Sequence, residues 1–73
     1  MMIERKAFEK LTITAQSLEI ISRGKLLKSR LDKSYVVNLF LLDELMVEIA
    51  YEKQTNSIAR VDIVDDDRLN LYL

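Results

Sequence analysis

The ionisable side chains of this 73-residue chain are carboxylates, phenols and basic groups, because the sequence contains no histidine and no cysteine. Nucleophilic triads, imidazole bases and thiolate catalysis therefore lack their residues, and metal sites built on imidazole or thiolate lack their ligands. A phosphate-cradling loop needs several glycines, and the chain has one. Catalysis by a carboxylate pair would need a water-excluding cleft, which a domain this small seldom encloses. We expect a protein that is not an enzyme, with no catalytic residue, no cofactor and no metal.

Five polar residues are predicted to share the outer, solvent-facing side of a β-sheet: Lys28, Asn38, Glu48, Arg60 and Asp62. The simplest interpretation is a ladder of cross-strand ion pairs, each worth about 0.2–1 kcal/mol. The alternatives are a polar recognition patch or a cation site that uses Asn38, Glu48 and Asp62, although hard cations prefer six or more oxygen ligands. With Glu48 on a solvated face, the substitution Glu48→Ala should cost well under about 1 kcal/mol.

Basic residues are concentrated in the first half of the chain. Residues 1–33 carry eight Lys or Arg against four acidic residues, and residues 34–73 carry three against eight, so the net charge of −1 conceals +4 and −5. The densest stretch is residues 23–33, with Arg23, Lys25, Lys28, Arg30 and Lys33. It makes nucleic-acid binding a second functional hypothesis, but no aromatic residue lies there for base stacking. A solvated stretch facing the acidic half, within one fold or between copies, is the simpler interpretation.

The elements that position these residues follow from hydrophobic periodicity. Apolar residues three and four apart predict an amphipathic helix over residues 3–23. Its apolar stripe consists of Ala7, Phe8, Leu11, Ala15, Leu18 and Ile21. The β-branched residues 12–14 weaken helix propensity, so a break at that point is the alternative. Gly24 is expected to end the helix in the left-handed conformation.

Beyond Gly24 the period changes to two, which predicts strands at residues 35–42, 45–52 and 59–64 in an antiparallel meander. Residues 27–31 form either a fourth strand or the tail of the helix.

Hydrophobic matching also predicts the register of the first hairpin. It sets Leu41 opposite Leu45 across a three-residue loop, because a two-residue turn would put Glu48 opposite Leu39 on the apolar face. In the second hairpin, a three-residue loop ends at Asn56, which is expected in the left-handed conformation.

This register places the odd-numbered strand residues under the helix and leaves a second apolar patch on the outer face. We expect this patch to serve as an interaction surface formed by Val36, Phe40, Met46, Val64 and Tyr72. Tyr72 belongs to a short C-terminal helix over residues 68–73 that follows three aspartates. That helix either covers the patch or leaves it open to another chain. The two alternatives are compatible if the helix is exchanged between subunits, because the helix of one subunit then covers the patch of the other.

Short motifs in the second half carry a resemblance. Val47-Glu48-x-x-Tyr51, Asn56, Ile58 and the closing Leu71-Tyr72-Leu73 resemble a group of small bacterial proteins of unknown role with a leading helix, a meander and a short final helix. The resemblance implies this fold and a bacterial origin, and it carries no activity or ligand.

We therefore predict a single α+β domain over residues 1–73, with an N-terminal helix packed on a three- or four-stranded antiparallel meander and a short C-terminal helix. A domain this small buries a modest share of its surface, and association is the stabilising device that its composition leaves. We expect a non-catalytic protein-interaction module that forms a homodimer or binds another protein. The charged N-terminus and the lack of a long apolar run predict a cytoplasmic protein without a signal peptide or membrane span.

Overall fold

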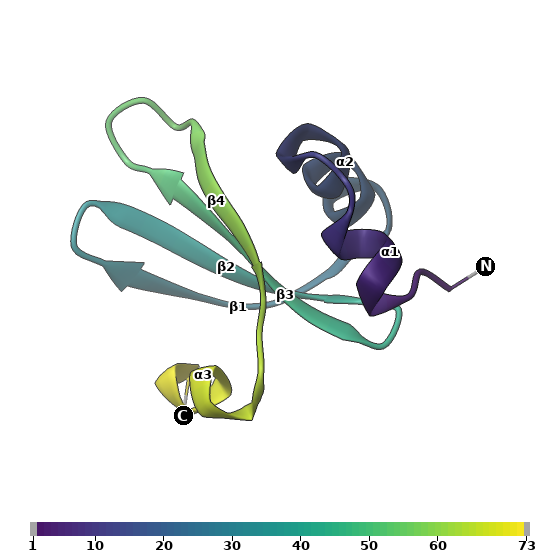
Figure 1. Ribbon diagram of the computed structural model, residues 1–73. Coiled ribbons are helices and arrows are strands. Elements are labelled where there is room, and N and C mark those ends of the chain that lie inside the picture. Colours follow the sequence, from purple (N-terminus) through teal and green to yellow (C-terminus); the bar gives the residue numbers. More distant parts are fainter. Residues whose placement is uncertain (1, 73) are drawn as a thin grey trace.

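Helices lie on both faces of one antiparallel sheet in the computed structural model, which describes residues 2–72 (Figure 1). The strands are β1 (Lys25–Asp32), β2 (Tyr35–Leu42), β3 (Leu45–Glu52) and β4 (Ile58–Ile63), and they are ordered in the sheet as in the chain. One face carries α1 (Arg5–Glu9) and α2 (Ile13–Arg23), and the other carries α3 (Asp66–Leu69) and the 3-10 turn η1 (Asn70–Tyr72). We call these the α2 face and the α3 face. The predicted α+β fold is confirmed, with four strands.

The N-terminal helical segment is divided into α1 and α2 at the break that the β-branched residues had suggested as the alternative. Thr12 stands at the N-cap of α2, where its hydroxyl accepts a hydrogen bond from the backbone N–H of Ala15 at 3.1 Å. The side chain of Gln16 donates to the carbonyl of Phe8 at 2.9 Å, which holds the two helices together.

The break changes which side of α2 faces the sheet. Ser17 and Ile20 are buried against it, whereas Leu18 and Ile21 are exposed. The predicted apolar stripe is therefore wrong at Leu18 and Ile21, because it assumed one continuous helix. Phe8 of α1 is buried as predicted.

Gly24 is needed for space, and the predicted left-handed conformation is wrong. Its φ is −74° and its ψ is 151°, which any residue can adopt. A Cβ atom at Gly24 would lie 2.4 Å from the carbonyl oxygen of Ile20, so the helix end closes tightly on this residue before β1 begins.

The register between β2 and β3 differs from the prediction by one residue. Leu42 pairs with Leu45 across the two-residue turn Asp43–Glu44, and Leu39 does lie opposite Glu48. The shift turns the even-numbered residues of β2 toward the α2 face, since successive side chains point to opposite faces. Asp43 adopts a φ of 53°, the left-handed region that aspartate tolerates better than most residues.

The register between β3 and β4 agrees with the prediction over most of its length. Val47 pairs with Ile63 and Ile49 with Val61, while a bulge brings Ile58, in place of Ala59, opposite Tyr51. Asn56 has a φ of 56°, which confirms the predicted left-handed position.

Two apolar cores result, one on each face. The larger, on the α2 face, is formed by Phe8, Ile20, Leu42, Val47 and Ile49. The smaller, on the α3 face, is formed by Leu39, Val64 and Tyr72, with Met46 and Leu69 packed against it. Because β3 contributes to both cores, its central residues are buried on both faces of the sheet.

Candidate interaction surfaces

The C-terminal segment closes over the middle of the α3 face. Asp65 starts α3, and its carboxylate accepts a hydrogen bond from the backbone N–H of Arg68 at 3.2 Å, as expected for an N-cap. The turn then directs Leu69 and Tyr72 onto the sheet. This arrangement agrees with the alternative in which the terminal helix covers apolar residues of the outer face.

A carboxylate lies beneath this segment. The Glu48 side chain is only 1% exposed, and one of its oxygens accepts a hydrogen bond from the Tyr72 hydroxyl at 2.5 Å. The same oxygen lies 3.4 Å from the Arg30 guanidinium, and the other lies 3.4 Å from Nε of Arg68. A buried carboxylate needs such partners because loss of hydration is otherwise uncompensated. Glu48 therefore joins β1, β3 and the C-terminal segment.

Tyr72 is held from several sides. Its ring lies under the Arg30 guanidinium, whose central carbon is 5.3 Å from the ring centroid, and its backbone carbonyl accepts a hydrogen bond from Nζ of Lys28 at 2.7 Å. Burial and the hydrogen bond to Glu48 raise the pKa of Tyr72 to about 12. The phenol thus stays protonated and remains a donor to Glu48.

The predicted polar row is brought together in part. Lys28, Glu48 and Asp62 lie in one transverse row on the α3 face, with Leu39 between Lys28 and Glu48, and Arg60 lies in the neighbouring row beside Ala50. Asn38 is placed on the α2 face by the shifted register, where its carbonyl oxygen accepts a hydrogen bond from Ser29 at 2.6 Å. The predicted grouping of Asn38 with Glu48 is therefore wrong.

The predicted interaction patch is divided between the two faces. Val36 and Phe40 lie on the α2 face, opposite Tyr51 and Val47. The other members, Met46, Val64 and Tyr72, lie in the small core of the α3 face. The sequence reasoning failed here because it depended on the register of β2. Whether these residues take part in association, or the terminal helix is exchanged between copies, stays a prediction.

The two carboxylates proposed as cation ligands are engaged with arginines. Asp62 pairs with Arg60 at 3.1 Å, and Glu48 is held as above. Among residues 2–72, no three acidic side chains gather as ligands for a metal ion. With Asn38 on the opposite face, the three oxygen donors proposed for a cation do not meet.

The basic stretch at residues 23–33 is partly neutralised within the fold. Arg23 pairs with Glu19 at 2.9 Å and with Asp43 at 3.1 Å, while Arg30 and Lys28 are bound to the α3-face network. Within the described part of the chain, Lys25 and Lys33 form no ion pair and no side-chain hydrogen bond. Three of the five basic side chains thus have partners inside the chain, and two of them, Arg23 and Arg30, pair with carboxylates of the acidic half.

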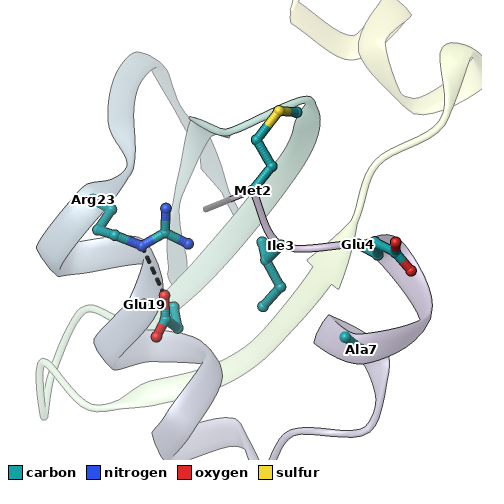
Figure 2. Close-up of a pocket in the computed structure, with 6 residues that line it drawn as sticks. All are labelled: Met2, Ile3, Glu4, Ala7, Glu19 and Arg23. Carbon is teal, nitrogen blue, oxygen red and sulfur yellow. Dashed lines mark hydrogen bonds and ion pairs between the residues drawn. The ribbon is translucent and has the colours of Figure 1, made fainter.

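A pocket of about 530 Å³ opens beside α2 and the N-terminal segment (Figure 2). Met2, Ile3 and Ala7 provide its apolar wall, and its charged groups are Glu4, Glu19 and Arg23. Figure 2 shows that Glu19 and Arg23 bind each other across one side of it. Two of the three charged groups that line the pocket are thus paired with each other. The pocket therefore offers few free polar groups to a ligand.

The edge strand β1 carries three exposed leucines. Among residues 2–72 its one neighbouring strand is β2, and α2 contacts the sheet mainly at β2 and β4, so that Leu26 is 55% and Leu31 is 70% exposed. Leu27, at a bulge in β1, is also exposed. Sequence reasoning left this segment undecided between strand and helix and therefore missed its leucines as surface residues. Their spacing around a bulge hides the alternation that would have identified them.

The fold and its surfaces define an α+β protein with helices on both faces of its sheet, a covered polar network on one face and an open apolar edge at β1. Comparisons with protein-family models, with curated proteins and with solved structures find no match to this chain. The resemblance to small bacterial proteins thus stays a prediction. No helix in the described residues is both long and apolar enough to cross a membrane.

Proposed function

We propose that this chain is a non-catalytic protein-interaction module that self-associates through the open edge of β1. The observation that carries the proposal is that, within residues 2–72, β1 has a strand partner on one side alone and carries three exposed leucines. Backbone N–H and C=O groups at such an edge can pair with a further strand, and apolar side chains beside them add burial. A cytoplasmic location belongs to this proposal, and so does the absence of catalysis.

The engaged ionisable groups support a role in binding. Glu48, Asp43 and Asp62 each bind an arginine, so their carboxylates are used to hold elements together. The basic stretch, with three of its five charges already partnered, offers less to a phosphate backbone than its sequence suggested.

Sedimentation equilibrium at micromolar concentrations tests the proposal. We expect masses above 8.5 kDa that rise with concentration, and the substitution Leu31→Asp should abolish the association, because a charge would then lie in the apolar edge. The matched control is Ile13→Asp, which also places a charge at an exposed apolar position, since Ile13 is 52% exposed. Ile13 is the first residue of α2, and Gln16 in the same turn lies beside β4, at the opposite edge of the sheet from β1. Far-UV circular dichroism verifies that both variants fold. A wild-type chain that stays monomeric would refute self-association.

A further inference from the structure

Because one residue of β1 is a bulge, the residues of β1 that pair with β2 are odd in number and have a middle member. Seven residues of β1 oppose residues of β2, and Leu27 is the additional residue at the bulge. Counted along these seven positions, Ser29 is the fourth, with Lys25 at one end and Asp32 at the other. The two halves of the strand on either side of Ser29 can therefore be compared position by position.

The two halves match in face and in chemistry. Leu26, Ser29 and Leu31 point to the α2 face, because they oppose Phe40, Asn38 and Val36. The remaining four paired residues, Lys25, Lys28, Arg30 and Asp32, point to the α3 face. The positions next to Ser29 are both basic, and the second positions from it are both leucine. The third positions are Lys25 and Asp32, which carry opposite charges.

We propose that two copies of this chain pair antiparallel along β1, with Ser29 on the two-fold axis and the two four-stranded sheets joined into one. This inference rests on the proposed function and adds its partner and register. Leu26 of each copy then lies opposite Leu31 of the other, and Lys25 lies opposite Asp32. Opposed residues in an antiparallel pair share a face, so this register buries leucine against leucine and sets unlike charges together at both ends.

The one unfavourable juxtaposition is Lys28 opposite Arg30 of the second copy. Both side chains are engaged within their own chain: Nζ of Lys28 donates to the Tyr72 carbonyl at 2.7 Å, and the Arg30 guanidinium lies 3.4 Å from Glu48 and 3.6 Å from Asp32. Basic residues on an edge strand ordinarily prevent pairing with another chain. Here the heads of these two are withdrawn from the edge.

Other antiparallel registers lose the complementarity. A two-fold axis at Lys28 sets Lys25 opposite Arg30 and Leu26 opposite Ser29. An axis at Arg30 leaves Leu26 and Lys25 without an opposite residue. Among these registers, the one centred on Ser29 pairs both leucines and both end charges.

Introduced cysteines can test the register, since the natural chain has none. The variant Ser29→Cys should form a disulfide-linked dimer with oxidised glutathione, because the two β-carbons at the axis lie about 4.5–5.5 Å apart, close to disulfide geometry. Leu31→Cys should not, because its two copies lie four positions apart, roughly 13 Å along the strands. The double variant Leu26→Cys with Leu31→Cys should restore the cross-link. Glu44→Cys, at the exposed position of the β2–β3 turn, measures collisional cross-linking.

The outcomes separate the two proposals. A wild-type chain that dimerises in the centrifuge, with Ser29→Cys cross-linking no faster than Glu44→Cys, overturns the register and leaves self-association standing. Faster cross-linking by Leu31→Cys than by Ser29→Cys also overturns the register.

A charge exchange provides a second test of the register that does not alter Ser29. Lys25→Asp alone and Asp32→Lys alone should each cause loss of dimer, and the two together should regain it. A double variant as weak as either single variant contradicts the pairing of the strand ends.

Discussion

Glu48 shows how one buried side chain can join three elements. Its carboxylate binds Arg30 from β1, Arg68 from α3 and the hydroxyl of Tyr72. Replacing a buried ion pair by apolar residues is often tolerated, but removing one partner leaves the others unpaired. We therefore expect Glu48→Ala to lower the free energy of unfolding by about 3 kcal/mol, against the small cost expected from the sequence. Urea denaturation measures it, and the exposed Glu44→Ala is the control; equal midpoints for the two variants would contradict the network.

The phenol of Tyr72 should lose its proton at a higher pH than an ordinary tyrosine. Its pKa is raised from its ordinary value to about 12 by burial and by the hydrogen bond to Glu48. The neutral phenol is therefore the form that the fold favours, so its contribution to stability is complete below about pH 10 and is lost as the pH rises toward 12. The ultraviolet absorbance of tyrosinate follows the titration. Tyr72→Phe should remove a component near pH 12, and wild-type and variant curves of the same shape would exclude the shift.

At the scale of elements, Asp43 holds the N-terminal segment and α2 to the β2–β3 turn. It accepts a hydrogen bond from the backbone N–H of Ile3 at 2.7 Å and pairs with Arg23, and these interactions hold its pKa below the ordinary value. The charged form is thus favoured in the fold, so the stability it adds is present above about pH 4 and is lost as the pH falls further. Asp43→Asn keeps a residue suited to the left-handed conformation and removes the charge, and with it both the ion pair to Arg23 and this pH dependence.

Unfolding midpoints in urea at about pH 6 and about pH 3 test this linkage. The wild type should lose more stability between the two than Asp43→Asn does. Glu44→Gln, at the next position of the turn, is the control, because Glu44 forms no ion pair or side-chain hydrogen bond among the described residues. The same acid loss in wild type and Asp43→Asn would show that Asp43 adds no pH-dependent stability.

The elements were predictable from the sequence to the extent that each had one apolar face. β3 and β4 alternate clearly, and their pairing of Val47 with Ile63 was predicted correctly. β2 is apolar on both faces, so periodicity could not select its register, and the choice depended on the assumption that a glutamate faces water. Glu48 is buried because Arg30, Arg68 and Tyr72 converge on it from distant parts of the chain, and no local pattern contains that information.

At the scale of the whole molecule, the helices cover the sheet unevenly. Two layers protect β3 on both faces, while β1 remains at an edge with most of its residues exposed. The N-terminal and C-terminal halves meet through Arg23 with Asp43 and Arg30 with Glu48, so part of the charge separation in the sequence serves to close the fold. The exposed leucines of β1 have no such partner layer, and this imbalance is the reason to place association there.

Amide hydrogen exchange at two protein concentrations tests this distribution of protection. Amides of β3 are bonded into the centre of the sheet and buried, so they should exchange only when the whole domain unfolds, at either concentration. Amides of β1 that point away from β2 should exchange rapidly in dilute solution, because no strand among residues 2–72 offers them an acceptor. At concentrations where the dimer forms, they should become protected while exposed amides of the loop at residues 53–57 stay unchanged. Protection that appears first in α2 or the C-terminal segment would locate the contact elsewhere.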